Sequence, residues 1–146
     1  MPDDSSLSVA VALDVHDGWP PVPSEPLLVH PSGDGFVVDQ TPAFALDLSL
    51  GDTVAASRGA DGTLRFERRI TAGGHRSFRI ISLAGSDLVE PVLERLGTLG
   101  ASVTPSGFPQ LWCVDVPPRA PEPAVRAALE EAASRGVLEF EDPRTP

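Results

Sequence analysis

Cysteine, lysine and tyrosine are almost or entirely missing from this chain. Its 146 residues include one cysteine, Cys113, and no tyrosine. A single thiol excludes an internal disulfide bond and is consistent with a reducing compartment, so we expect a cytoplasmic protein. All eleven basic residues are arginine, and they are outnumbered by 21 acidic residues, which gives a formal net charge of −10.

This charge balance limits the classes of partner. An acidic surface repels the phosphate backbone of nucleic acids and anionic lipid headgroups. Long apolar runs are also missing: no stretch approaches the roughly 18 apolar residues of a spanning helix, and residues 1–4 are too acidic for a secretion signal. We therefore expect no nucleic-acid and no membrane partner, and favour a small molecule, a peptide or a protein.

Short strands joined by glycine and aspartate turns dominate the first half. β-Branched and alternating apolar residues predict strands at residues 7–15, 27–30, 36–39, 53–58 and 64–70. Residues 16–18, 31–35 and 59–62 carry the Gly and Asp signals of turns, and the last two predict hairpins. Such a series predicts a small β-barrel or a strongly bent sheet over residues 1–74.

Helical periodicity appears only in the second half. Apolar residues at helical spacing predict helices between Leu88 and Leu99 and over residues 122–135, and strands are predicted at residues 78–83, 101–104, 111–116 and 137–141. Pro91 leaves two alternatives for the first helix, a start near Glu90 or a distorted first turn. The order β-α-β-β-α-β is typical of the ferredoxin-like fold.

The two halves together predict an α+β protein. We expect the β-rich half, residues 1–74, to pack on the ferredoxin-like half, residues 75–146, as one compact unit with its seam near residues 71–74. A ferredoxin-like sheet carries both helices on one face. Its open face then needs the β-rich half, a partner or a second copy of the chain to cover it, and the last of these would make a homodimer.

Several short motifs occur in a characteristic order between Val9 and Asp142. In this order and spacing the chain resembles a bacterial domain-of-unknown-function family, the one numbered 4265, which is common in actinobacteria. This family implies a bacterial cytosolic setting but no particular activity. Relatives tend to read Gly-His-Ser-Thr where this chain has an additional arginine. The motifs are Asp17-Gly18-Trp19-Pro20-Pro21-Val22, Pro42-Ala43-Phe44-Ala45, Leu50-Gly51-Asp52-Thr53-Val54, Gly74-His75-Arg76-Ser77 and Val114-Asp115-Val116-Pro117-Pro118.

The best candidate site begins at His75. In an extended segment His75, Ser77 and Arg79 share one face, because side chains alternate along a strand. A histidine, a hydroxyl and a guanidinium in line can bind an anion, with His75 as acid or base. The alternative is a solvent-facing polar edge without a functional role. Asp115, on a strand expected beside Arg79, is a candidate contact of Arg79, either in the site or as a structural ion pair.

Other candidate groups carry weaker signals. Cys113 is interpreted as a small buried hydrophobe rather than a nucleophile. No two of His16, His30 and His75 have metal-site spacing, and no glycine-rich phosphate loop is present, so we expect no metal and no cofactor. Trp19 and Phe44, together with Trp112, could line an apolar pocket or anchor the core.

Two function classes remain open from the sequence. The first is a binding or accessory protein that holds a small molecule, peptide or protein at the seam or the open sheet face. The second is a small enzyme that tailors a bacterial specialised metabolite, with His75 as general acid or base. The absence of a convergent catalytic motif favours the first class, and ferredoxin-like domains host many functions.

Overall fold

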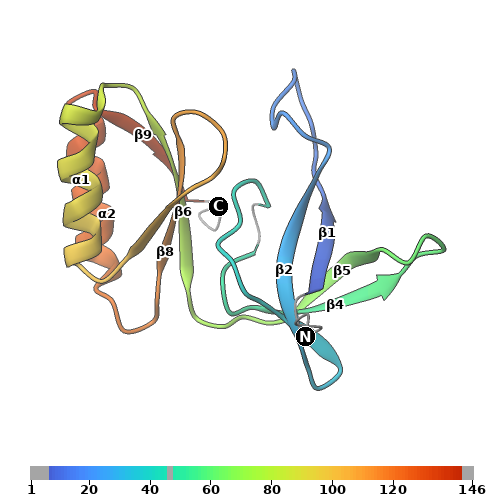
Figure 1. Ribbon diagram of the computed structural model, residues 1–146. Coiled ribbons are helices and arrows are strands. Elements are labelled where there is room, and N and C mark those ends of the chain that lie inside the picture. The colour runs from blue at the N-terminus through green and yellow to red at the C-terminus, as the bar shows by residue number, and fades with distance from the viewer. Residues whose placement is uncertain (1–6, 46–47, 143–146) are drawn as a thin grey trace, which may run out of the picture. The chain divides into compact units, whose positions relative to one another are not determined.

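The structure is a computed structural model, and it describes residues 7–45 and 48–142. The chain divides into two compact units, Met1–Gly74 and His75–Pro146. Each unit has its own sheet and its own apolar core, and both helices belong to the second unit (Figure 1). The α+β class predicted from the sequence is confirmed.

Five strands make up the N-terminal unit: β1 (Leu7–Ala12), β2 (Ser24–Ser32), β3 (Gly35–Val38), β4 (Thr53–Arg58) and β5 (Leu64–Thr71). Each strand is antiparallel to the next, and the sheet bends until β1 and β5 meet and close a barrel. In a series of five alternating strands the first and the last run in the same direction. Their closing contact, through Val9–Leu64 and Ala10–Arg65, is accordingly parallel.

The barrel is filled by alternate side chains of its strands. In β2, buried Leu27 and Val29 alternate with exposed neighbours, which gives the period of two expected for a strand with one buried face. The first strand ends at Ala12 rather than at Val15. Beyond it, His16 and Trp19 exchange backbone hydrogen bonds of 2.9 and 3.0 Å across a two-residue turn with positive φ values. The Asp-Gly turn predicted there is confirmed.

The C-terminal unit runs β6 (Arg76–Ser82), α1 (Ser86–Thr98), β7 (Ser102–Pro105), β8 (Leu111–Val116), α2 (Glu122–Ser134) and β9 (Leu138–Glu141). Its strands form one sheet in the order β7-β8-β6-β9, and every neighbouring pair is antiparallel. Both helices lie on the same side of this sheet (Figure 1). Residues of the helices and inward residues of the strands share one core. Its almost completely buried members include Leu96 and Leu129 of the helices and Phe78, Ile80, Val114 and Leu138 of the strands.

The helix ends follow their local chemistry. α1 begins at Ser86 and contains Pro91, so a start near Glu90 is excluded. The Gly85 carbonyl accepts hydrogen bonds from the N–H groups of both Leu88 and Val89, at 3.0 and 3.1 Å. Gly100 and Gly136, both with positive φ, follow the two helices. Among the described residues no helix has the length and apolar character needed to cross a membrane.

Candidate functional site

One face of the C-terminal sheet lies opposite the helices, and we call it the helix-free face. Phe78 and Ile80 point into the core beneath α1 and α2, so Ser77 and Arg79 of the same strand point to the other side. The register places Asp115 of β8 between Ser77 and Ser102. The helix-free face therefore collects polar side chains from every strand, namely Ser77, Arg79, Ser102, Thr104, Cys113, Asp115, Glu139 and Glu141.

His75 and Asp115 form a polar contact on this face. His75 directly precedes β6, and its Nδ1 lies 2.9 and 3.0 Å from the two carboxylate oxygens of Asp115. The side chain of Asp115 is 4% exposed and that of His75 is 21% exposed. The carboxylate is thus buried under the imidazole, which keeps some contact with solvent. When Asp115 is ionised it accepts a hydrogen bond from Nδ1–H, so that in the neutral imidazole the lone pair lies on Nε2.

Burial sets the proton affinity of Asp115. Desolvation raises the pKa of its carboxyl above 3.8, while the hydrogen bond from His75 and its charge oppose this rise. The pKa of this carboxyl therefore depends on the imidazole beside it as well as on burial. The pair is therefore a candidate for holding or passing on a proton on this face.

Arg79 has a different partner from the one expected. The contact predicted between Arg79 and Asp115 is wrong in its pairing, because Asp115 binds His75 and Arg79 binds Glu141 of β9. In the register Arg79 stands opposite Cys113, two residues away from the position opposite Asp115. Cys113 is buried, as interpreted from the sequence, and it stands opposite Arg79 of β6. Sequence reasoning missed Glu141, since only strand pairing brings β9 beside β6.

The two aromatic candidates pair with each other in the N-terminal unit. The rings of Trp19 and Phe44 meet edge to face, with centroids 5.7 Å apart and planes at 79°. Phe44 is buried and Trp19 is 43% exposed. Trp112, by contrast, packs against the core of the C-terminal unit. The three rings therefore do not line one pocket within either unit.

Glu25 holds the segment that carries Phe44. Its buried carboxylate accepts hydrogen bonds from the backbone N–H groups of Ala43, Phe44 and Ala45, at 2.6, 2.9 and 2.8 Å. Three consecutive donors converge on this one carboxylate. No sequence signal separated Glu25 from the solvated acids of this chain, apart from its place beside apolar strand residues.

Asp52 has a comparable role at the start of β4. It is fully buried and accepts hydrogen bonds from the N–H groups of Ser49 and Gly73, at 3.0 and 2.9 Å. Arg69 lies 3.8 Å from the same carboxylate. A turn at Leu50 and Gly51 precedes Asp52, and the carboxylate ties that turn to the end of the unit.

A second histidine–aspartate pair lies on the surface of the barrel. His30 Nδ1 is 2.8 and 2.9 Å from the two oxygens of Asp39, but these side chains are 46% and 41% exposed. Across the described residues, 7–45 and 48–142, no three His, Cys, Asp or Glu side chains gather as a metal site would need. Asp47, which could join Asp39 and Asp52 in a metal site by residue type, lies outside the described residues.

Comparison with known proteins gives a family and a fold. Residues 25–140 match the family model described as Domain of unknown function (DUF4265). A solved structure, described as a novel crystal structure of a hypothetical protein from Neisseria gonorrhoeae, matches with a TM-score of 0.74 and 23% identity. The match covers 97% of this chain and 95% of that one, and at this identity it supports the fold alone. No curated protein matches.

Proposed function

We propose that this chain, which belongs to the DUF4265 family, is a binding or accessory protein that engages its ligand through His75. The contact between His75 Nδ1 and Asp115 carries this proposal, because it orients the imidazole and leaves Nε2 for a ligand. With Asp115 ionised, Nε2 accepts a hydrogen bond from a hydroxyl or an N–H group. With the imidazole protonated, Nε2 donates to an anion.

The neighbours of this pair favour a polar ligand group. Ser77 and Ser102 flank Asp115 in the register, so hydroxyls stand on both sides of the carboxylate. Ligand contacts would involve Ser77, Arg79 and Asp115 as well as His75. Trp19 and Phe44 form a separate aromatic pair that we propose as an apolar contact for a ligand.

A panel of ligands in a thermal-shift assay tests the binding role. A compound that binds the folded chain raises its stability, by about 2.7 kcal/mol at one hundred times Kd. Compounds with hydroxyl, amide, carboxylate and phosphate groups are compared on wild type and His75→Ala, with His16→Ala as the exposed histidine control. We expect a hit whose shift is lost in His75→Ala and kept in His16→Ala. Compounds whose thermal shift is the same in wild type, His75→Ala and His16→Ala would contradict the proposal.

A change in the stability of His75→Ala needs an interpretation of its own, because the imidazole has a buried partner. Removing the imidazole strands the buried Asp115 carboxylate, and stranding a buried polar partner costs about 1–3 kcal/mol. A lower melting temperature therefore does not exclude a functional His75. Adding Asp115→Asn separates the two effects, because this amide no longer buries a charge.

The enzyme alternative rests on the same contact. A carboxylate at Nδ1 places the lone pair of a neutral imidazole on Nε2, which is what a general base needs. The ¹⁵N chemical shifts of His75 at neutral pH test this point. A protonated Nδ1 with an unprotonated Nε2 supports the alternative, and a proton on Nε2 of the neutral ring would count against it.

For the C-terminal unit we also propose the ferredoxin-like class. Its element order, its strand order β7-β8-β6-β9 and its two helices on one face support this assignment. We further propose that the chain acts in the cytoplasm, without nucleic acid, membrane or cofactor, and that a second copy is one candidate partner for the helix-free face. Analytical ultracentrifugation of wild type tests whether two copies of the chain associate.

A further inference from the structure

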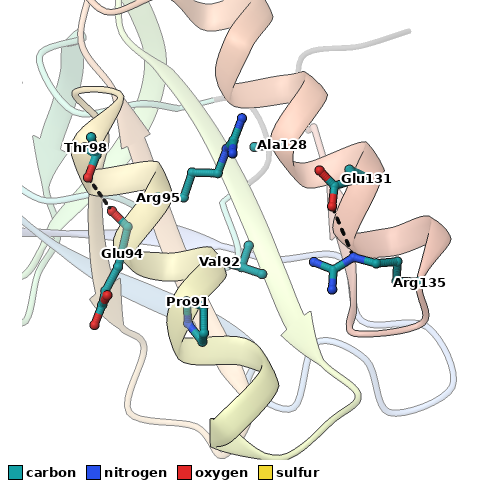
Figure 2. A pocket seen from close by; sticks show the side chains of 8 residues that line it. All are labelled: Pro91, Val92, Glu94, Arg95, Thr98, Ala128, Glu131 and Arg135. Atoms are coloured by element: carbon teal, nitrogen blue, oxygen red, sulfur yellow. Dashed lines mark hydrogen bonds and ion pairs between the residues drawn. The ribbon is translucent and has the colours of Figure 1, made fainter.

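A groove lies between α1 and α2 on the outer side of the C-terminal unit (Figure 2). Its volume is about 470 Å³, within the range of roughly 300–1,000 Å³ typical of small-molecule sites. It contains none of the residues proposed to serve His75. Its lining comes from both helices: Pro91, Val92, Glu94, Arg95 and Thr98 of α1, with Ala128, Glu131 and Arg135 of α2 or its end.

The floor of the groove is apolar. Val92 and Ala128 are buried where the helices pack together, and Pro91 extends this surface at one end. Pro91 also lacks an N–H group, so it adds apolar surface without a backbone donor. A ligand with a small apolar body would therefore bury carbon against carbon here.

Arginines stand at the rim of this floor. Figure 2 shows Arg95 reaching from α1 toward α2 near Ala128, while the Glu94 carboxylate points away from α2. Within the described part of the chain, the Arg95 side chain makes no hydrogen bond or ion pair. Arg95 lies in the last turn of α1, where a positive charge interacts favourably with the helix dipole. This interaction does not require the guanidinium to extend over the groove.

The second arginine already holds a carboxylate. Arg135 Nε lies 3.2 Å from Glu131 Oε1, and both side chains are more than half exposed. Exposed pairs of this kind contribute little to stability, so a ligand can replace Glu131 at little cost. The rim thus offers two guanidiniums to an incoming anion, and one of them is engaged by an exchangeable internal carboxylate.

We propose that this groove binds a small carboxylate with an apolar body. The carboxylate would meet Arg95 and compete with Glu131 for Arg135, and the apolar part would lie on Pro91, Val92 and Ala128. Both a free organic acid and the C-terminal carboxylate of a peptide have this chemistry. The site is separate from His75, so either proposal can fail without the other.

Titration of the full-length ¹⁵N-labelled protein with sodium hexanoate tests the groove. We expect saturable shifts confined to the amides of residues 91–98 and 128–135 and to the Arg95 side chain. N-Acetyl-leucine, which imitates a peptide C-terminus, and its amide, which lacks the charge, form the second arm. Tighter binding of hexanoate indicates a free acid, tighter binding of N-acetyl-leucine indicates a peptide end, and the amide should not bind.

Matched variants make the test specific. Arg95→Gln should weaken binding at least tenfold, whereas Arg119→Gln, an exposed arginine outside the groove, should leave it unchanged. Glu131→Gln should strengthen binding, because it removes the internal competitor. Shifts that never saturate, that spread beyond the groove, or that survive Arg95→Gln would overturn the proposal.

Discussion

Buried carboxylates are satisfied differently in the two units of this chain. In the N-terminal unit Glu25 and Asp52 accept hydrogen bonds from backbone N–H groups, which do not titrate. In the C-terminal unit the partner of Asp115 is an imidazole, which does. The same type of residue therefore fixes a loop in one unit and lies beside an ionisable side chain in the other. The partner, more than burial itself, separates a structural acid from a candidate site.

The largest effect should follow removal of Glu25. Glu25→Ala strands three backbone donors, and hydrogen bonds to a charged group contribute about 1.5–3 kcal/mol each, so we expect a loss of at least about 3 kcal/mol. Urea unfolding followed on the amides of β2 measures it within the N-terminal unit. The exposed Glu67→Ala is the control and should change stability by less than about 0.5 kcal/mol. Equal effects of the two substitutions would refute a structural role for Glu25.

The connection made by Asp52 can be tested from its donor side. A Cβ atom on Gly73 would lie 2.3 Å from the Gly51 carbonyl oxygen, so Gly73→Ala must displace the backbone that Asp52 joins. We expect a loss of about 1–3 kcal/mol, as for overpacked interiors. Gly97→Ala, within α1 and with no atom near its Cβ, should instead gain up to about 1 kcal/mol. Two changes of the same sign in the melting temperature would contradict this.

The pH dependence of stability should reveal Asp115. Its raised pKa means that the folded chain binds this proton more tightly than the unfolded chain does. The stability from this group is thus complete below pH 3.8 and is lost as pH rises through the folded pKa. We expect the stability of wild type relative to Asp115→Asn to fall across that window. On a His75→Ala background the fall should extend to higher pH, because His75 lowers the pKa of Asp115.

The smallest effect should come from the exposed pair. His30 and Asp39 have nearly the same geometry as His75 and Asp115, but water screens them. Chemical denaturation of His30→Ala should show a loss of less than about 0.5 kcal/mol, well below that of His75→Ala. A larger loss for His30→Ala would mean that burial does not distinguish the pairs.

Local patterns predicted most of the elements because they depend on near neighbours along the chain. The strands at residues 53–58 and 111–116 match β4 and β8 residue for residue. The strand expected to continue to Val15 was too long, because its pairing with β2 ends at Ala12 and Ser24. The sequence did not decide whether α1 begins before Pro91 or near Glu90. The helix begins at Ser86 because the packing of Val89 and Val92 in the core outweighs the unfavourable proline.

The sequence by itself determined the kinds of element, their order, the turns between them and the common face of His75, Ser77 and Arg79. Periodicity and turn chemistry act over a few residues, so they can be read along one chain. Only the tertiary structure decided that Asp115 binds His75, that Arg79 binds Glu141 and that Glu25 is buried. These contacts join residues 18 to 62 positions apart. They depend on strand register and on which surfaces become covered, and a one-residue change in register would exchange every partner.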